Sequence, residues 1–199
     1  MKYGFRTYFN AGFLGIISML FGVNSAWGLI EPYIASYLII HDPTKTTSSV
    51  HLLNLMITIA GLPASYSFVW VINFCGYKQG IGLSCIIAFT GLLLSYFTTN
   101  FYLMIIGWFL FGMGKHWFKL VGSFMMMLLM PDSIGLANSL SNVGTSFAPI
   151  YWSYMALALL NPNNSPADIT RQEGETTRNY WSEGSGVASN LPYLFIVNS

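Results

Sequence analysis

The chain has 199 residues, of which 54% are apolar and only 8% are charged, and its formal net charge is +1. A soluble domain carries about 25% charged residues, so this composition excludes an ordinary soluble globule, whose surface needs more polar groups. The near-neutral charge also excludes the electrostatic footprint of a nucleic-acid-binding protein.

Five long apolar segments follow one another along the chain. They are residues 13–40, 50–74, 79–98, 101–130 and 134–160. A sixth begins at Leu191. Each of the five is long enough for a membrane-spanning helix, which needs about 20 mostly apolar residues, and none shows the short alternating strands of a β-barrel. The pattern predicts an all-α polytopic membrane protein, with a five-helix bundle in residues 1–160 and the truncated start of a sixth helix in residues 191–199.

The connections between the first five segments are short, so neighbouring helices are expected to run antiparallel. Residues 161–190 are the exception, a polar stretch whose Gly, Ser, Asn and Pro content is typical of a loosely ordered loop. Lys2, Arg6 and Lys78 fall on one side of the predicted membrane, and Lys45 falls in the short loop on the other. Because basic residues favour the cytoplasmic side, we expect a cytoplasmic N-terminus and an extracytoplasmic 161–190 loop.

Four ionisable residues interrupt the apolar segments: Glu31 in the first, and Lys115, His116 and Lys119 in the fourth. A charge at the bilayer centre costs roughly 2.5–3.5 kcal/mol on the insertion scale, so such groups usually face a cavity or a partner. Lys115 lies near the middle of its segment, and Glu31 is expected to pair with it, which lowers the cost of both charges. Lys119 lies farther along, where its long side chain can alternatively extend to the membrane interface.

The sequence predicts no metal site, no cofactor and no enzymatic activity. His116 points about 100° away from Lys115 on the helical wheel and is better explained as a packed or hydrogen-bonded residue than as a metal ligand. Cys75 and Cys85 are not spaced like a zinc or redox motif. The sequence motifs of zinc proteases and serine hydrolases are absent.

Small and polar residues recur at helical spacing on four of the five segments. They are Asn24, Gly28 and Glu31 on the first; Asn54, Thr58, Gly61 and Ser65 on the second; Gly112, Lys115, Lys119 and Ser123 on the fourth; and Asn138, Ser141, Asn142, Thr145 and Pro149 on the fifth. The third segment has no comparable stripe and is expected to face lipid. The pattern predicts a bundle around a hydrated cavity, although stripes of Ser, Thr and Gly also simply let helices pack closely.

Three stretches carry a family resemblance. They are WGLIEPY at 27–33 with SYL at 36–38, NFCGYK at 73–78, and GLANS at 135–139 with NP at 161–162. Together they resemble the amino-terminal half of a major facilitator superfamily transporter, in its oxalate/formate antiporter-like and monocarboxylate transporter-like branch. The second stretch occupies the place of the superfamily's signature between helices two and three, and it has Asn73 where an Asp is usual.

The resemblance implies a fold of twelve helices in two six-helix halves, with the substrate at mid-membrane between the halves and transport by rocking. In that fold, helices one, two, four and five of this half face the cavity and helix three lies outside. Because the sixth helix is cut short at Ser199, the chain is expected to be a fragment, or to need its missing carboxy-terminal half or another subunit.

We therefore expect a secondary active transporter of small organic anions such as carboxylates, working by alternating access in a multi-pass arrangement, with the plasma membrane favoured. Lys115 and Lys119 would attract the carboxylate, and Glu31 would compete for Lys115 or carry a coupling proton. Hydrogen bonds to the solute would come from Asn24, Asn138 and Asn142. The alternative is a non-transporting membrane subunit or a truncated transporter-like protein, which the altered signature favours.

Overall fold

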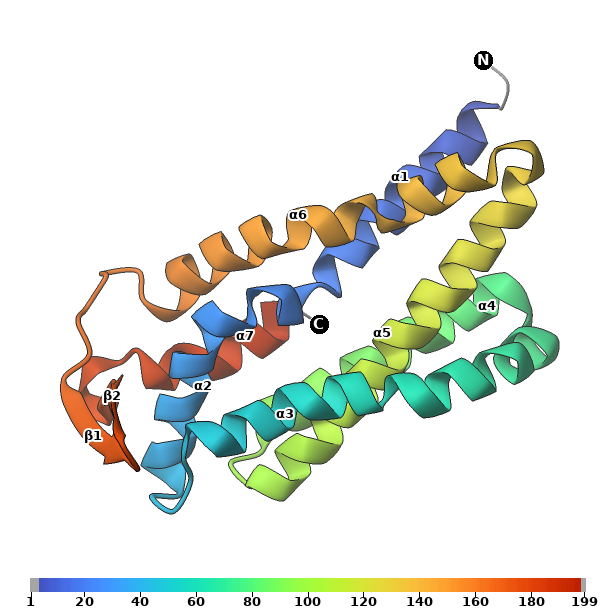
Figure 1. Ribbon diagram of the computed structural model, residues 1–199. Helices are drawn as coiled ribbons and strands as arrows, with labels where there is room; N and C mark the ends of the chain where they lie inside the picture. The colour runs from blue at the N-terminus through green and yellow to red at the C-terminus, as the bar shows by residue number, and fades with distance from the viewer. Residues whose placement is uncertain (1–3, 198–199) are drawn as a thin grey trace.

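The computed structural model describes residues 4–197, and most of them are helical (Figure 1). The α-helices are α1 (Phe5–Leu20), α2 (Trp27–His41), α3 (Thr47–Ile59), α4 (Gly61–Phe97), α5 (Phe101–Leu129), α6 (Ile134–Leu160) and α7 (Leu191–Val197). Short 3-10 helices are η1 (Val23–Ala26), η2 (Pro131–Ser133), η3 (Glu183–Ser185) and η4 (Ala188–Asn190). Two strands, β1 (Ile169–Glu173) and β2 (Thr176–Tyr180), form an antiparallel hairpin. The predominantly helical fold is thus as predicted, whereas the hairpin is not.

The helices run back and forth between two ends of the molecule (Figure 1). One end holds the start of α1, a reversal within α4 and the α5–α6 connection. The opposite end holds the α2–α3 and α4–α5 connections and the hairpin. Residues 198 and 199 of the predicted sixth helix, and the side chain of Ser141, lie outside the described part of the chain.

Helix α4 folds back on itself at Gly76. This residue has φ 77° and ψ 171°, a conformation that is neither helical nor accessible to most side chains. A β-carbon placed at Gly80 would lie 3.5 Å from Cγ1 of Val71, so the two arms on either side of Gly76 lie against each other. The reversal falls where the sequence places the short connection between the second and third segments.

The first predicted segment is not one continuous helix. It is divided into α1 and α2 by η1, and the pair is bent by 44°. At the break, the carbonyl of Met19 accepts hydrogen bonds from the backbone of Gly22 and from the indole of Trp152 on α6, each at 3.0 Å. Gly22 has no side chain to keep α6 away, and a β-carbon there would collide with that of Ala148. Contacts with α6 therefore stabilise a bend that local sequence alone does not predict.

The second arm of α4 carries a buried stripe of small residues. The stripe consists of Gly80, Ser84, Ala88, Gly91 and Ser95. It packs on α5, and a β-carbon at Gly114 would lie 2.6 Å from the backbone nitrogen of Ala88. The prediction that this segment lacks a stripe is therefore wrong, because Gly and Ala allow two helices to approach closely without adding polarity. The opposite face, with Ile86 and Phe97, is exposed.

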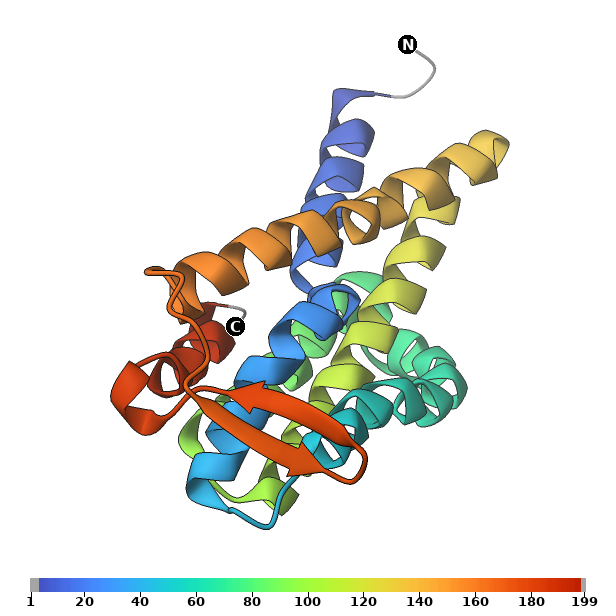
Figure 2. The same cartoon turned by 60° about the vertical axis from the view of Figure 1, so that its left-hand side comes forward.

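Residues 161–190 form a docked hairpin rather than the loosely ordered loop that composition predicts. Figure 2 shows the hairpin lying across the ends of α2 and α3. The ring of Trp181 stacks on Tyr33, with centroids 4.7 Å apart, and its backbone N–H donates to the Ser36 hydroxyl at 3.1 Å. The backbone N–H of Thr47 donates to both carboxylate oxygens of Glu173, at 3.3 and 3.1 Å. Glu173 thus places a negative charge at the positive N-terminus of α3.

Two helical stretches of the described residues are long and apolar enough to cross a membrane, Thr47–Phe97 and Pro131–Leu160. A third is added if Thr7–Leu20 and Val23–His41, the bent pair, are one span. Helix α5 has 29 residues, but two lysines and a histidine interrupt its apolar sequence. The membrane-like character expected from composition is confirmed in this general form, and the larger number of spans stays a prediction.

Candidate functional site

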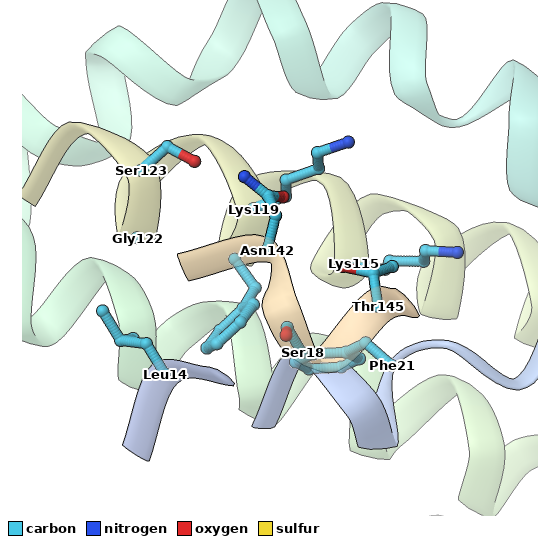
Figure 3. A pocket seen from close by; sticks show the side chains of 10 residues that line it. Leu14, Ser18, Phe21, Lys115, Lys119, Gly122, Ser123, Asn142 and Thr145 are labelled. Atoms are coloured by element: carbon cyan, nitrogen blue, oxygen red, sulfur yellow. The ribbon is translucent and has the colours of Figure 1, made fainter. Parts of the chain in front are cut away.

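A cavity of about 30 Å³ lies where α1, α5 and α6 meet, and it gathers several of the predicted site residues. Figure 3 shows the side chains around it. Its polar lining residues are Ser18, Lys115, Lys119, Ser123, Asn142 and Thr145. The stripe on α5 and part of the stripe on α6 therefore face a common space, as the helical spacing predicts.

Lys115 is partly buried, and its ammonium donates a hydrogen bond to the side-chain oxygen of Asn24 in η1. This contact brings together two predicted site residues that are 91 positions apart. Asn24 is neutral, and no ion pair links Lys115 to a carboxylate within the described residues. The positive charge of Lys115 is therefore solvated without being neutralised.

Glu31 does not pair with Lys115, and that prediction is wrong. Its Oε1 lies 3.5 Å from Nε2 of His51 on α3, and the side chain of Glu31 is 15% exposed. The reason is the break at η1, because the prediction extended one straight helix through residues 13–40. Beyond the break, α2 runs beside α3 and carries Glu31 toward that helix. The Glu31 carboxylate thus belongs to a second polar contact outside the cavity.

Lys119 lines the cavity one helical turn after Lys115 and is exposed. Like charges at this spacing on one helix face repel each other. Neither ammonium is balanced by an acidic side chain in the part of the chain that the structure describes. The two lysines therefore make this face of α5 electropositive.

The two asparagines on α6 have different environments. Asn142 lines the cavity, and its side-chain nitrogen donates to the backbone and side-chain oxygens of Asn138, at 2.8 and 2.9 Å. Asn138 itself is exposed and does not line the cavity. Asn138 thus contacts a lining residue rather than the cavity, which corrects its predicted place.

The polar stripe on the second segment does not reach this cavity either. Gly61 instead makes room for the ring of His116, since a β-carbon there would lie 3.0 Å from two ring atoms. His116 also hydrogen-bonds to the backbone of Ile57. The interpretation of His116 as a packed, hydrogen-bonded residue is confirmed. Its ring fills the space between α5 and the junction of α3 and α4, so the helices pack closely there.

The sequence analysis missed the contribution of α1. Ser18 and Phe21 line the cavity, and the Ser18 hydroxyl donates to the Gly15 carbonyl at 2.7 Å. Gly15, Ser18 and Gly22 form a small-residue stripe, and Gly15 touches Gly144 on α6 so closely that no β-carbon fits at Gly144. The spacing of three and four residues between Gly15, Ser18 and Gly22 is a sequence signal for this helix contact.

The surface of this cavity is formed mostly by apolar atoms, although its lining residues include two lysines, three hydroxyl residues and one asparagine. Its volume of about 30 Å³ suffices for a water molecule, which needs roughly 10–15 Å³ of such space. No group of three or more His, Cys, Asp or Glu side chains that could hold a metal ion occurs among the described residues. The chemistry that this set of side chains offers is the attraction and hydrogen bonding of an anion.

Comparisons with known proteins add no family assignment to this geometry. No protein-family model matches the chain, and no curated protein matches it. The functional interpretation therefore depends on the residues of the site.

Proposed function

We propose that the chain is the amino-terminal half of a major facilitator-type secondary transporter that carries small organic anions such as carboxylates. The observation that carries the proposal is the position of Lys115 and Lys119. Both line one cavity between predominantly apolar helices, and neither is neutralised by a described carboxylate. Ionisable groups at such positions are costly and typically mark the path of a solute or ion.

The course of the chain supports five membrane crossings. The stretch Thr47–Phe97 has 51 residues. At 1.5 Å per residue it would be about 77 Å long as a straight helix, whereas the hydrocarbon core of a bilayer is about 30 Å thick. The reversal at Gly76 divides it into two crossings, and α5, α6 and the bent α1–α2 pair supply the other three. Consecutive crossings then end alternately at opposite ends of the molecule, in the arrangement of Figure 1.

The contact between Lys115 and Asn24 suits an anion-binding site. An ammonium group has three donors, and Asn24 takes one of them without cancelling the charge. An arriving carboxylate pairs with the remaining donors of Lys115 and with Lys119 one turn away. Thr145, which lines the same cavity, can donate a further hydrogen bond, whereas both N–H donors of the Asn142 amide are engaged by Asn138.

The space for the solute lies between this face and a second polypeptide. The cavity within the chain is too small for a carboxylate, and Lys119 and Asn138 are exposed beside it. Polar groups like these are poorly accommodated by lipid tails. A second half packed over α1, α5 and α6 would cover them and close the solute between two walls, as alternating access requires.

Glu31 is the candidate for proton coupling. It is mostly buried on α2, and its carboxylate lies 3.5 Å from the ring of His51 on α3. Because it is not paired with Lys115, its protonation acts on the α2–α3 contact rather than directly on the anion.

The test is uptake of labelled carboxylates by the complete protein in lipid vesicles. Lys115→Ala is expected to reduce uptake at least tenfold, since a charge-assisted pair typically contributes about 1.5–3 kcal/mol. Lys45→Ala, in the α2–α3 connection and away from the cavity, is the matched control and is expected to retain uptake. Undiminished uptake by Lys115→Ala would refute the role of this residue, and no uptake by the unaltered complete protein would favour a non-transporting subunit.

A further inference from the structure

A second cavity, of about 370 Å³, lies between the hairpin and the start of α3. It shares no lining residue with the cavity around Lys115. Its volume falls within the roughly 300–1,000 Å³ that is common for small-molecule sites. Its lining includes Ser48, His51, Glu173, Thr176 and Arg178. Figure 2 shows the hairpin that forms one of its walls, lying over α3.

The negative charge in this cavity is already engaged. Burial raises the pKa of the Glu173 carboxyl, but hydrogen bonds from Tyr180 and Thr47 and the nearby charge of Arg171 outweigh it, so the pKa lies below its ordinary value. The ionised carboxylate accepts the Thr47 N–H at the positive end of α3. Glu173 therefore stabilises the wall of the cavity, and its negative charge is partly balanced by the N-terminus of α3 and by Arg171.

Arg178 is the cation without a partner. It lines the cavity, is exposed, and forms no hydrogen bond or ion pair with any residue in the described range 4–197. Arg171 lies directly opposite Arg178 in the strand register, but it has a hydrogen-bond partner and lies outside the cavity. The guanidinium of Arg171 donates to the Pro43 carbonyl at 2.9 Å, and the residue does not line the cavity. The two arginines are thus a matched pair, in which Arg171 contacts Pro43 and Arg178 lines the cavity.

We propose that this cavity binds a small carboxylate through Arg178. A guanidinium presents its donors in a planar fork that matches the two oxygens of a carboxylate. Ser48 lines the same space, and its hydroxyl makes no hydrogen bond to a described residue, so it can donate to the bound anion. The cavity lies at the end of the molecule predicted to be extracytoplasmic. Binding of a carboxylate in this cavity does not depend on the proposed transport function. Only the role of the cavity as an outer site, occupied before the site at Lys115, rests on that function.

The experiment measures protection of a thiol placed inside the cavity. Ser48→Cys is introduced into the full chain together with Cys75→Ala and Cys85→Ala, and the protein in lipid nanodiscs is treated with uncharged N-ethylmaleimide. Acetate and oxalate are expected to slow the modification severalfold, whereas acetamide, which has the shape of acetate without its charge, is not. Adding Arg178→Gln is expected to raise the concentration needed for half-protection about tenfold, as for loss of a charge-assisted pair.

Arg171→Gln in the same background is the control, because it removes an equal charge from the same hairpin outside the cavity. Because Arg171 also contacts Pro43, this variant is expected to weaken the protection by acetate less than Arg178→Gln does. The proposal would be overturned if acetate protected the Arg178→Gln protein as well as the protein with Arg178. It would also be overturned if acetamide protected as well as acetate, or if neither acetate nor oxalate protected the thiol. This measurement tests only binding in the cavity beside Ser48. Its outcome is therefore independent of the uptake measured for Lys115→Ala, which tests the proposed function.

Discussion

The ammonium of Lys115 on α5 donates a hydrogen bond to the side chain of Asn24, at the break between α1 and α2. An amide oxygen solvates a cation without cancelling its charge, whereas a carboxylate at the same place would form an ion pair. The choice of an asparagine therefore leaves Lys115 able to attract an anionic solute. The contact also joins the bend of the first segment to the centre of α5.

Asn24→Asp is the most direct test of this relationship. The new carboxylate is expected to occupy Lys115 and to raise the solute concentration for half-maximal uptake about tenfold, which corresponds to about 1.4 kcal/mol. Asn24→Ala, which removes the hydrogen bond without adding charge, is expected to have the smaller effect. Both are measured by vesicle uptake of a labelled carboxylate, and unchanged uptake in Asn24→Asp would contradict the role assigned to Lys115.

The close approach of α4 and α5 predicts opposite effects at two glycines of one helix. A β-carbon at Gly91 would lie 2.6 Å from the backbone nitrogen of Phe111, whereas one at Gly82 has no neighbour within 4 Å. Gly91→Ala is expected to destabilise the protein by about 1–3 kcal/mol through overpacking. Gly82→Ala is expected to be neutral or stabilising by up to about 1 kcal/mol. Thermal unfolding in detergent, followed by circular dichroism, measures both, and equal melting temperatures would argue against this helix contact.

Docking of the hairpin is expected to weaken in acid. Because the pKa of Glu173 is lowered in the folded state, its contribution is present at neutral pH and is lost as the pH falls below 4.5 toward the lowered pKa. Fluorescence of Trp181, obtained by difference from Trp181→Phe, reports its stacking on Tyr33.

Glu173→Gln is expected to reduce this acid response without removing it. The pKa of Asp168 is also lowered, by hydrogen bonds from the side chain and backbone of Ser182, so Asp168 titrates in the same range. The double variant with Asp168→Asn is expected to show the smallest transition, because only Asp42, whose pKa is also lowered by hydrogen bonds from Thr44, remains beside the Pro43 contact of the hairpin. An unaltered transition in the double variant would mean that other groups control docking.

Glu31→Gln separates solute binding from proton coupling. If Glu31 carries the coupled proton, the variant is expected to lose the stimulation of uptake by an imposed proton gradient and to retain exchange driven by the solute alone. The amide of the introduced glutamine does not ionise near neutral pH, so the variant cannot carry the coupled proton. Lys115 is not part of the Glu31–His51 contact, so solute binding at Lys115 is expected to remain. Retained stimulation by the gradient would exclude Glu31 as the coupling group.

Elements with long apolar sequences and clear breaks could be predicted closely from the sequence. The segments predicted at 101–130 and 134–160 agree with α5 and α6 to within one residue. The reversal at Gly76 lies within the predicted connection, because Gly and Lys interrupt the apolar run there. Hydrophobic length determines these features locally, so no knowledge of distant contacts is needed.

Features that depend on distant contacts could not be predicted in this way. The hairpin has a strand-like alternation in which Glu173, Arg178 and Tyr180 share a face, but both faces are polar, so hydrophobic periodicity gives no signal. Its order comes from Thr47, 126 positions from Glu173. Helical spacing on the straight helices α5 and α6 predicts that Lys115, Lys119 and Asn142 lie near one another. The bend of the first segment is not predictable from such spacing, and it places Glu31 outside the cavity and Ser18 in its lining.

The indole of Trp152 donates to the Met19 carbonyl, and the two residues are 133 positions apart. During synthesis, Met19 leaves the ribosome long before Trp152 exists. In lipid, a segment that must satisfy its own backbone groups is most stable as an unbroken helix. The nascent first segment is therefore expected to enter the bilayer straight and to acquire its bend only when α6 arrives. Because Asn24 lies in that bend, we expect the contact between Asn24 and Lys115 to form only after α5 and α6 have both been synthesised.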